Sequence, residues 1–386
     1  GRAKGYGVDF SLRGELLSGV GNALVAVEKE RNEVEGSVKT KAFDLGKLLA
    51  DKRFGTLAAD IRGGGSLKSK TYFLKGSIPY FQYNKYDYKN ITVDADYDNG
   101  LVNGRFNIAD DNIAASLDGS IDVSSKDKAI RAVASISRFA PSRLNLFKGR
   151  LAEADYKADI VADITGHDIN SASGHLAVRN FSMKSTATEY ALDSLLFKAG
   201  HSRRGHYLAV DGDFGKAVVY GNFDYASLPQ SIENIIVRKL PGITNLAPFK
   251  YRPVHTGRVA VQAYICNSDW AKPFLNIPLE IREPLSVAAD VDNASNSIQA
   301  EIRSSDIVYG NYHLKNVRTT ARTVDNRLEI EAALRNMRSE SLGTDIELKT
   351  NAGSDKLMLS LSLDNHALQQ RLHGNVYGGV EFRKNS

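Results

Sequence analysis

The chain has little sulfur and no long apolar run. The first shortage excludes a fold held by disulfides, and the second argues against a membrane-spanning helix. Its 386 residues contain one cysteine, Cys266, so no disulfide can form within the chain. No stretch approaches the ~18–20 apolar residues that a membrane-spanning helix needs. We therefore expect no membrane span in this segment, and we expect Cys266 to be a small buried side chain without redox chemistry.

The charge distribution gives no sign of a nucleic-acid partner. The net charge is +5, from 50 basic and 45 acidic residues, and the basic residues are spread along the chain. No nucleic-acid recognition motif is present. The densest basic patch is Arg203-Arg204, and we interpret it as a solvated loop.

The motifs of enzymes and of metal proteins are also missing. The eight histidines never take metal-ligand spacing with cysteine or acidic residues. Gly63-Gly64-Gly65 lacks the Lys-Ser/Thr and helix context of a phosphate-binding loop. Asp110-Asp111 falls in a turn, where aspartate is favoured for local reasons. We predict no catalytic residue, no metal site and no cofactor.

Alternation of apolar and polar residues fills most of the chain. From Ile91 to Val123 three such runs follow one another, and Asn99-Gly100 separates the first two. A period of two indicates strands with one apolar and one wetted face, and Asn-Gly between them is a strong hairpin signal. Further runs follow at intervals of roughly 8–12 residues, which is typical of an all-β protein. We predict an elongated, repeat-like antiparallel meander.

Two segments have helical spacing instead. Residues 43–50 and 228–240 each place their apolar side chains on one face, and Pro241-Gly242 ends the second. Residues 241–256 contain three prolines and form the best internal boundary. We expect a β segment over 1–226, a helix and proline-rich crossover over 227–256, and a β segment over 257–386 that continues the same sheet.

Several stretches together are familiar as a set. They are Phe43–Leu49, Phe54–Leu57, Leu74–Ile78, Tyr86–Ile91, Phe106–Asn112 and Leu117–Asp122. With their strand rhythm and Gly/Asp/Asn turns, they resemble the periplasmic region of the TamB family, within the wider AsmA-like group. The resemblance spans most of the chain and depends on rhythm more than on any single motif.

That resemblance implies a β-taco, a long sheet folded into a U-shaped trough with an apolar lining. It implies a periplasmic location in a Gram-negative bacterium, with an inner-membrane anchor in a longer parent protein. It also implies phospholipid transport to the outer membrane and support of outer-membrane protein assembly alongside a TamA-type barrel. This sequence shows neither the anchor nor the family's terminal partner-binding domain, so membrane and barrel contacts are expected of the parent alone.

The expected partners of this segment are phospholipid acyl chains, held by the apolar side of each strand. The candidate lining residues are Val8, Phe10, Leu12, Ile91, Val93, Phe106, Ile108, Leu117, Ile121, Val123, Leu176, Val178, Leu208, Val210, Ile298, Ile302, Leu328, Ile330, Leu334, Leu357, Leu359 and Leu361. A second candidate feature is the aromatic cluster Tyr80, Phe81, Tyr83, Tyr86 and Tyr88. It fits ordinary strand packing, and it also fits a seam where amphipathic rings meet lipid head groups or a partner.

Alternation alone leaves two alternatives open. A closed sandwich or barrel filled by its own side chains gives the same pattern as an open trough. The chain could equally be a structural or adhesin-like scaffold that binds protein partners by its outer face or its sheet edges. The resemblance favours the open trough and a lipid conduit.

Overall fold

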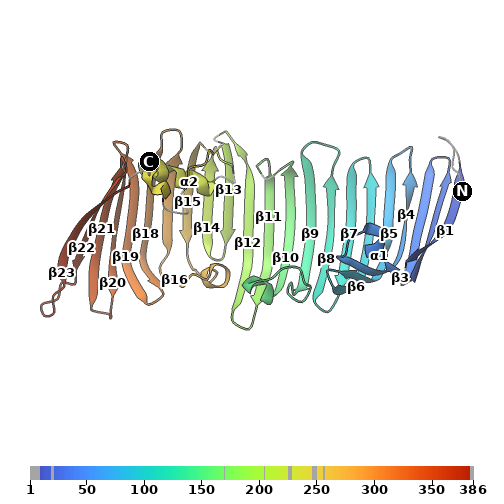
Figure 1. Cartoon of the computed structure of the whole chain (residues 1–386), viewed down its shortest axis with the longest axis horizontal. Coiled ribbons are helices and arrows are strands. Elements are labelled where there is room, and N and C mark those ends of the chain that lie inside the picture. The colour runs from blue at the N-terminus through green and yellow to red at the C-terminus, as the bar shows by residue number, and fades with distance from the viewer. Residues whose placement is uncertain are drawn as a thin grey trace. The chain divides into compact units, whose positions relative to one another are not determined.

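A computed structural model describes residues 9–18, 21–168, 170–203, 205–224, 228–245, 250–254 and 257–382. The chain divides into two compact units, an N-terminal unit of residues 1–194 and a C-terminal unit of residues 195–386. In both units nearly all described residues with regular structure are in β-strands (Figure 1).

The N-terminal unit consists of sequential antiparallel strands. They are β1 (Phe10–Ser18), β2 (Gly21–Glu30), β3 (Glu33–Asp44), β4 (Phe54–Ser66), β5 (Thr71–Tyr83), β6 (Tyr86–Asp98), β7 (Leu101–Ala109), β8 (Ile113–Asp122), β9 (Lys128–Phe139), β10 (Asp155–Gly166) and β11 (Ser173–Lys184). From β1 to β11 each strand pairs with the next one along the chain. The strand β12 (Glu189–Ser202) begins in this unit and ends in the C-terminal one.

The C-terminal unit continues in the same way with one exception. Its strands are β13 (Gly205–Gly212), β14 (Gly215–Gly221), β15 (Arg258–Ile265), β16 (Leu279–Ile281), β17 (Leu285–Asp292), β18 (Ser297–Tyr309), β19 (Tyr312–Val324), β20 (Arg327–Met337), β21 (Gly343–Gly353), β22 (Lys356–Asp364) and β23 (His373–Glu381). The exception is the short β16, which pairs with the last residues of β18 and not with β15. The strand β15 therefore pairs with β17, the next strand after β16. Because β14 pairs directly with β15, the sheet continues across the predicted crossover of residues 227–256.

The hairpin turns explain the tight meander. Asn99 and Gly100 both have positive φ, 46° and 102°, as do Asp325 and Asn326, at 46° and 60°. Two consecutive residues with positive φ match the right-handed twist of the strands they join, and Asn, Asp and Gly tolerate that backbone best. The Asn-Gly signal in the sequence therefore marks a real hairpin between β6 and β7.

This turn gives a test of the fold. In Gly100→Ala, the new Cβ would lie 2.5 Å from Ser124 Cβ and the positive φ would be strained. We expect the free energy of unfolding to fall by about 1–3 kcal/mol, measured by urea denaturation. Gly104→Ala is the matched control, because its nearest neighbour is Ala95 Cβ at 3.7 Å. Equal losses in both variants would contradict the turn assignment.

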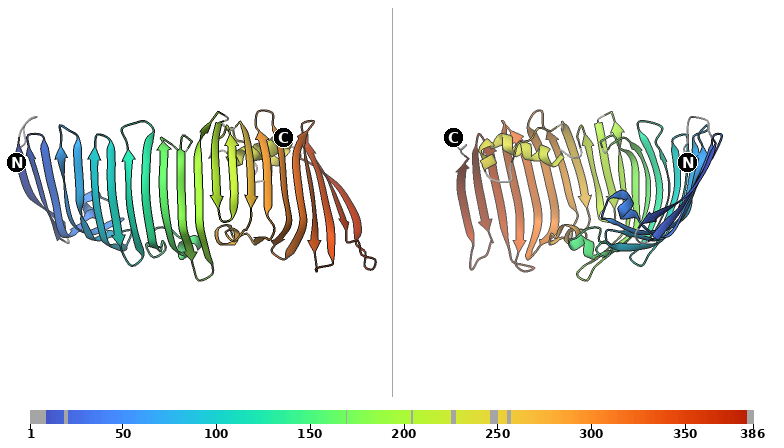
Figure 2. Two further views of the ribbon diagram at one scale, coloured as in Figure 1. Left: turned by 180° about the vertical axis from the view of Figure 1, so that it is seen from behind. Right: turned by 45° about the vertical axis from the view of Figure 1, so that its right-hand side comes forward.

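Both predicted helices are present. The helix α1 (Leu45–Leu49) begins at Asp44, whose side chain accepts a hydrogen bond from Lys47 N, and ends at Ala50 with a φ of 52°. The helix α2 (Leu228–Lys239) is followed by the 3₁₀ turn η3 (Pro241–Asn245). Two further turns, η1 (Arg150–Glu153) and η4 (Ala271–Leu275), lie in loops. In the right-hand view of Figure 2 the first strands of the N-terminal unit curve round α1.

The predicted all-β fold, an open antiparallel meander with two short helices, is confirmed. Among the described strands, β1 pairs only with β2 and β23 only with β22. No helix in the described ranges is both long and apolar enough to cross a bilayer. The expected burial of Cys266 is wrong: the side chain is exposed, because it follows the last residue of β15 in a loop, where its N–H donates to Phe214 O.

Candidate functional site

One face of the N-terminal sheet is apolar from strand to strand. Residues directly opposite each other in an antiparallel pair share a face, so the register extends one row across the whole unit. One such row runs through Val25, Val38, Ile61, Gly76, Val93, Phe106, Leu117, Ala134, Ile160 and Val178. We call the face that carries this row the N-terminal apolar face.

The candidate lining residues of this unit fall on that face. They are Phe10, Leu12, Ile91, Val93, Phe106, Ile108, Leu117, Ile121, Leu176 and Val178. Val123 comes directly after β8, and its N–H donates to Gly100 O at 2.7 Å. Val8 lies outside the described residues. That these side chains line a lipid path stays a prediction.

The N-terminal apolar face is open over much of its area. Leu74, Phe106 and Leu117 lie near its middle and are 45%, 39% and 43% exposed. Ile91 and Ile108, which are opposite each other on β6 and β7, are buried. A contiguous exposed apolar patch is unusual on a soluble surface and marks an interaction site.

A row of small residues runs along the middle of this face. Gly36, Gly63, Leu74, Ala95, Gly104, Gly119, Ala132 and Ala162 are successive register partners from β3 to β10, and Leu74 is the one large side chain among them. Larger side chains flank the row on both sides, for example Phe106 and Val102 beside Gly104. We call this row of mostly small side chains, which crosses the strands, the furrow; residue alternation within single strands did not reveal it.

The opposite face of the N-terminal sheet is polar and carries ion pairs. They join residues opposite each other on neighbouring strands: Lys39–Asp60 at 2.7 Å, Lys75–Asp94 at 3.1 Å, Arg105–Asp118 at 2.8 Å and Arg131–Asp163 at 3.5 Å. Exposed pairs of this kind add little stability. The paired residues occupy the strand positions between those of the apolar row, so this is the polar face of the sheet.

The C-terminal unit has an apolar face of the same kind. One row of register partners runs through Leu208, Val219, Val261, Ala289, Ala300, Ala321, Ile330, Thr350, Leu359 and Gly378. The candidate lining residues of this unit share its face, which we call the C-terminal apolar face. They are Leu208, Val210, Ile298, Ile302, Leu328, Ile330, Leu334, Leu357, Leu359 and Leu361.

The helix α2 covers one margin of the C-terminal apolar face. Val237, Leu240 and Ile243 form a buried cluster with Leu328 and Ala352, and Ile298, Ile330 and Leu357 pack around it. Hydrogen bonds fix the helix there: Arg238 donates to Asn293 O at 2.8 Å, and Lys239 Nζ to Asn326 Oδ1 at 2.7 Å. Burial lowers the pKa of Lys239. Ile302, farther from the helix, remains 36% exposed.

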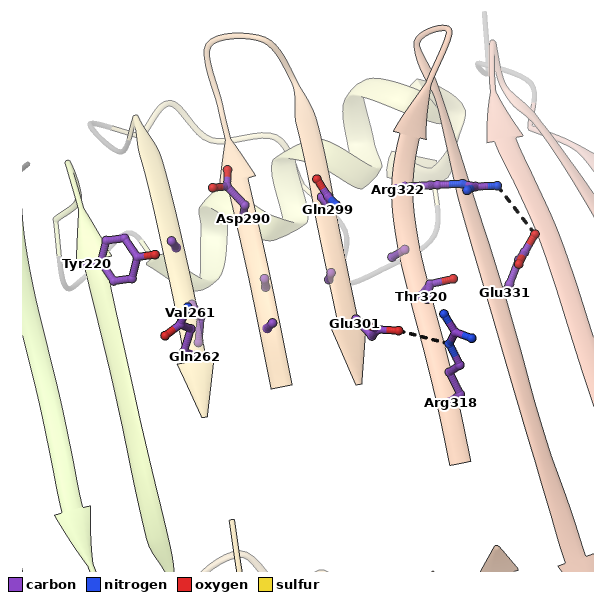
Figure 3. A pocket seen from close by; sticks show the side chains of 15 residues that line it. Tyr220, Val261, Gln262, Asp290, Gln299, Glu301, Arg318, Thr320, Arg322 and Glu331 are labelled. Atoms are coloured by element: carbon purple, nitrogen blue, oxygen red, sulfur yellow. Dashed lines mark hydrogen bonds and ion pairs between the residues drawn. The ribbon is translucent and has the colours of Figure 1, made fainter. Parts of the chain in front are cut away.

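The polar face of the C-terminal sheet carries a groove of about 510 Å³ (Figure 3). Its walls include Tyr220, Asp290, Arg318, Arg322 and Glu331, and the short side chains of alanines on β15 and β17 leave the space between them. Arg318 pairs with Glu301 at 3.1 Å and Arg322 with Glu331 at 3.9 Å. The lining holds both signs of charge and offers no anion- or cation-selective site.

Four members of the predicted aromatic cluster, Phe81, Tyr83, Tyr86 and Tyr88, come together on β5 and β6, whereas the fifth, Tyr80, makes no ring contact with them and is hydrogen-bonded to Asp87. Phe81 contacts Tyr83 and Tyr88 with ring centroids 6.2 Å apart, Tyr86 contacts Tyr88 at 4.8 Å, and Phe54 of β4 joins them. The hydroxyl of Tyr86 donates to the carboxylate of Asp110 and accepts from Asn112 Nδ2 at 3.0 Å. Asp110 also accepts from Asn112 N at 2.9 Å, so it serves the turn, as the sequence suggested.

This hydroxyl gives a pH-dependent prediction. Burial, and then the hydrogen bond to Asp110, raise the pKa of Tyr86 from 10.0 to about 12. The folded state therefore keeps a proton that the unfolded state loses, and the stabilisation by Tyr86 is present below pH 10 and is lost between about pH 10 and 12. We expect the stability gap between wild type and Tyr86→Phe in urea denaturation to be smaller at pH 11 than at pH 9. A gap equal at both pH values would contradict this assignment.

No group of three or more His, Cys, Asp or Glu side chains among the described residues is placed to hold a metal ion. Comparison of the chain with known protein families, with curated proteins and with solved structures finds no match. The two apolar faces are thus the candidate site, and their geometry is the basis for assigning a function.

Proposed function

We propose that this chain is a conduit segment that carries phospholipid acyl chains along its apolar faces. The observation that supports this most is the open N-terminal apolar face. One row of its residues lies in register across nine strand pairings, yet the large side chains near its centre are 39–45% exposed. A core residue would be covered by a second layer, and here an acyl chain would supply that layer.

The energetics favour such a role. Moving a lipid tail of ~15 methylenes through water costs ~12 kcal/mol, at ~0.8 kcal/mol for each methylene. An apolar surface that continues from strand to strand removes most of that barrier. The furrow of glycine and alanine lets a tail lie across the strands, while Phe106, Leu117 and Ile121 flank it. The opposite face carries the ion pairs, and its charged side chains keep that polar side of the sheet hydrated.

The setting of the conduit is part of the same proposal. In line with the resemblance to the TamB and AsmA-like group, the parent protein spans the periplasm of a Gram-negative bacterium and is anchored in the inner membrane. There it supports outer-membrane assembly with a TamA-type barrel. The segment itself acts without catalysis, because its role is to offer a surface and not to break a bond.

Site-specific photocrosslinking tests the proposal. A photoreactive phenylalanine derivative is placed at Phe106, on the N-terminal apolar face, or at the adjacent Asn107, on the polar face. After irradiation in cells, we expect phospholipid attached at position 106 and none at position 107, detected by mass spectrometry. Protein adducts at 106 with no lipid would overturn the conduit and favour the scaffold alternative.

A further inference from the structure

The connection between β9 and β10 carries a surface that neither apolar face accounts for. It runs over residues 140–154, whereas the nearby connections 84–85 and 110–112 are short turns. The strands β8, β9, β10 and β11 pair in sequence, so this connection lies in the interior of the meander and not at an end of the sheet. Figure 1 shows it at the lower margin of the N-terminal unit.

Hydrogen bonds and a buried side chain give the β9–β10 connection a fixed shape. Ser142 N–H donates to Ala152 O at 3.1 Å, which closes its two ends. Asn145 Nδ2 donates to Asn84 O, in the turn between β5 and β6, at 3.3 Å. Leu144 is fully buried. The connection therefore packs on its inner side, and its shape does not depend on the apolar side chains that it leaves exposed.

The outer side of the β9–β10 connection is apolar and basic. No acidic residue occurs over residues 142–152. Five exposed side chains form what we call the loop patch: Leu146, Phe147, Lys148, Arg150 and Leu151. Its three apolar members are 42%, 47% and 37% exposed, in chain order, and its two cations lie between Phe147 and Leu151. Exposed apolar side chains that gather in this way mark an interaction site.

This combination of side chains fits an anionic lipid surface. Leucine and phenylalanine gain free energy when they leave water for the boundary between head groups and acyl chains. Lysine and arginine on the same segment can extend their charged ends to the phosphate groups. An apolar protein surface would instead bury the two cations of the loop patch without partners, which is costly.

A second pair of exposed leucines lies along the same margin. Successive strands are antiparallel, so β3 and β9 run in the same direction and both end at this margin. The connection after β3 contains α1, in which Leu48 and Leu49 are 60% and 51% exposed. At the opposite margin the connections 99–100 and 124–127 consist of polar residues and glycine. The two margins of the N-terminal unit thus differ in character.

We infer that the loop patch docks the N-terminal unit on a membrane surface that contains anionic phospholipid. Leu146, Phe147 and Leu151 enter the interface, and Lys148 and Arg150 contact the phosphates of the head groups. The binding energy comes from side chains outside the two apolar faces. The inference therefore does not depend on the proposed lipid transport, and a chain that docks without carrying lipid would still satisfy it.

Vesicle sedimentation with the full chain tests the inference. We expect the chain to sediment with phosphatidylglycerol vesicles at low salt, and to bind phosphatidylcholine vesicles at least about tenfold more weakly, because these have no net charge. Phe147→Ser removes the largest apolar side chain of the loop patch, and Lys148→Glu reverses one of its charges. Each should weaken binding to phosphatidylglycerol vesicles about tenfold.

The matched controls lie at the opposite margin. Leu67→Ser, at a leucine that is 46% exposed after β4, and Lys126→Glu, between β8 and β9, make the same chemical changes there. Both should bind phosphatidylglycerol vesicles as the wild type does. Circular dichroism checks that all four variants fold. Equal binding to both kinds of vesicle, or equal losses in loop-patch and control variants, would overturn the inference. A chain that sediments with neither vesicle would also overturn it and would favour a protein partner.

Discussion

We expect Leu117→Arg to abolish lipid crosslinking at neighbouring positions of the N-terminal apolar face. Leu117 lies opposite Phe106 and Ala134 in the row that extends across the unit. An arginine there offers a passing acyl chain a charge with no partner on an apolar surface, which costs several kcal/mol where water is scarce. Since ~1.4 kcal/mol is a factor of ten in occupancy, lipid attached to a photoreactive group at position 106 or 160 should fall more than tenfold.

The matched control is Ser116→Arg, the next residue on β8, which faces the polar side with Asn107 and Ser135. It adds the same side chain to the same strand, and crosslinking should stay at the wild-type level. Circular dichroism of both variants checks that the sheet has formed. Because Leu117 is 43% exposed, arginine can reach water and the fold should survive. Equal lipid attachment in both variants would mean that the apolar face is scaffold and not a path.

The second large effect concerns stability. Leu328 is 7% exposed, beneath Val237, Leu240 and Ile243. Truncation of a buried leucine leaves a cavity and typically costs about 2–5 kcal/mol. We expect Leu328→Ala to lower the unfolding free energy of the C-terminal unit by that amount in urea denaturation, and α2 to become susceptible to limited proteolysis.

Ile302→Ala is the comparison for this prediction. Ile302 lies on the same C-terminal apolar face, but it is 36% exposed and outside the cluster beneath α2. Its truncation removes less buried area and should cost about 1 kcal/mol. If the two variants lose similar amounts of unfolding free energy, α2 does not bury Leu328 more deeply than Ile302, and this prediction is wrong.

Strand rhythm was sufficient to predict most of the fold. Alternation from Ile91 to Val123 gave the faces of β6, β7 and β8 correctly, because residues two apart in a strand point the same way whatever their tertiary surroundings. The turn at Asn99-Gly100 was predictable for an equally local reason. The segment 228–240 was recognisable as a helix, since Pro241 ends it and its apolar residues repeat at helical spacing.

What the helix covers was not predictable. The buried state of Leu328 depends on a contact with Val237, 91 positions earlier, and no local pattern separates Leu328 from the more open Ile302. The furrow was missed for a related reason. Gly36, Gly63 and Gly104 are far apart in the chain and come to share one row only through the register of successive hairpins. The exposed Cys266 was misjudged because average burial of cysteine says nothing about one position in a loop.

The furrow also bears on how fast a ligand could move. A tail lying along it would cross one strand for every ~4.8 Å of travel, and at nearly every step it would meet glycine or alanine, which have no rotamers to rearrange. Successive positions of the tail would then differ little in free energy. The tail would move by diffusion along a nearly flat free-energy profile, with one barrier at Leu74. On such a surface the transit rate would depend on the number of strands crossed and only weakly on the identity of the chain that crosses them.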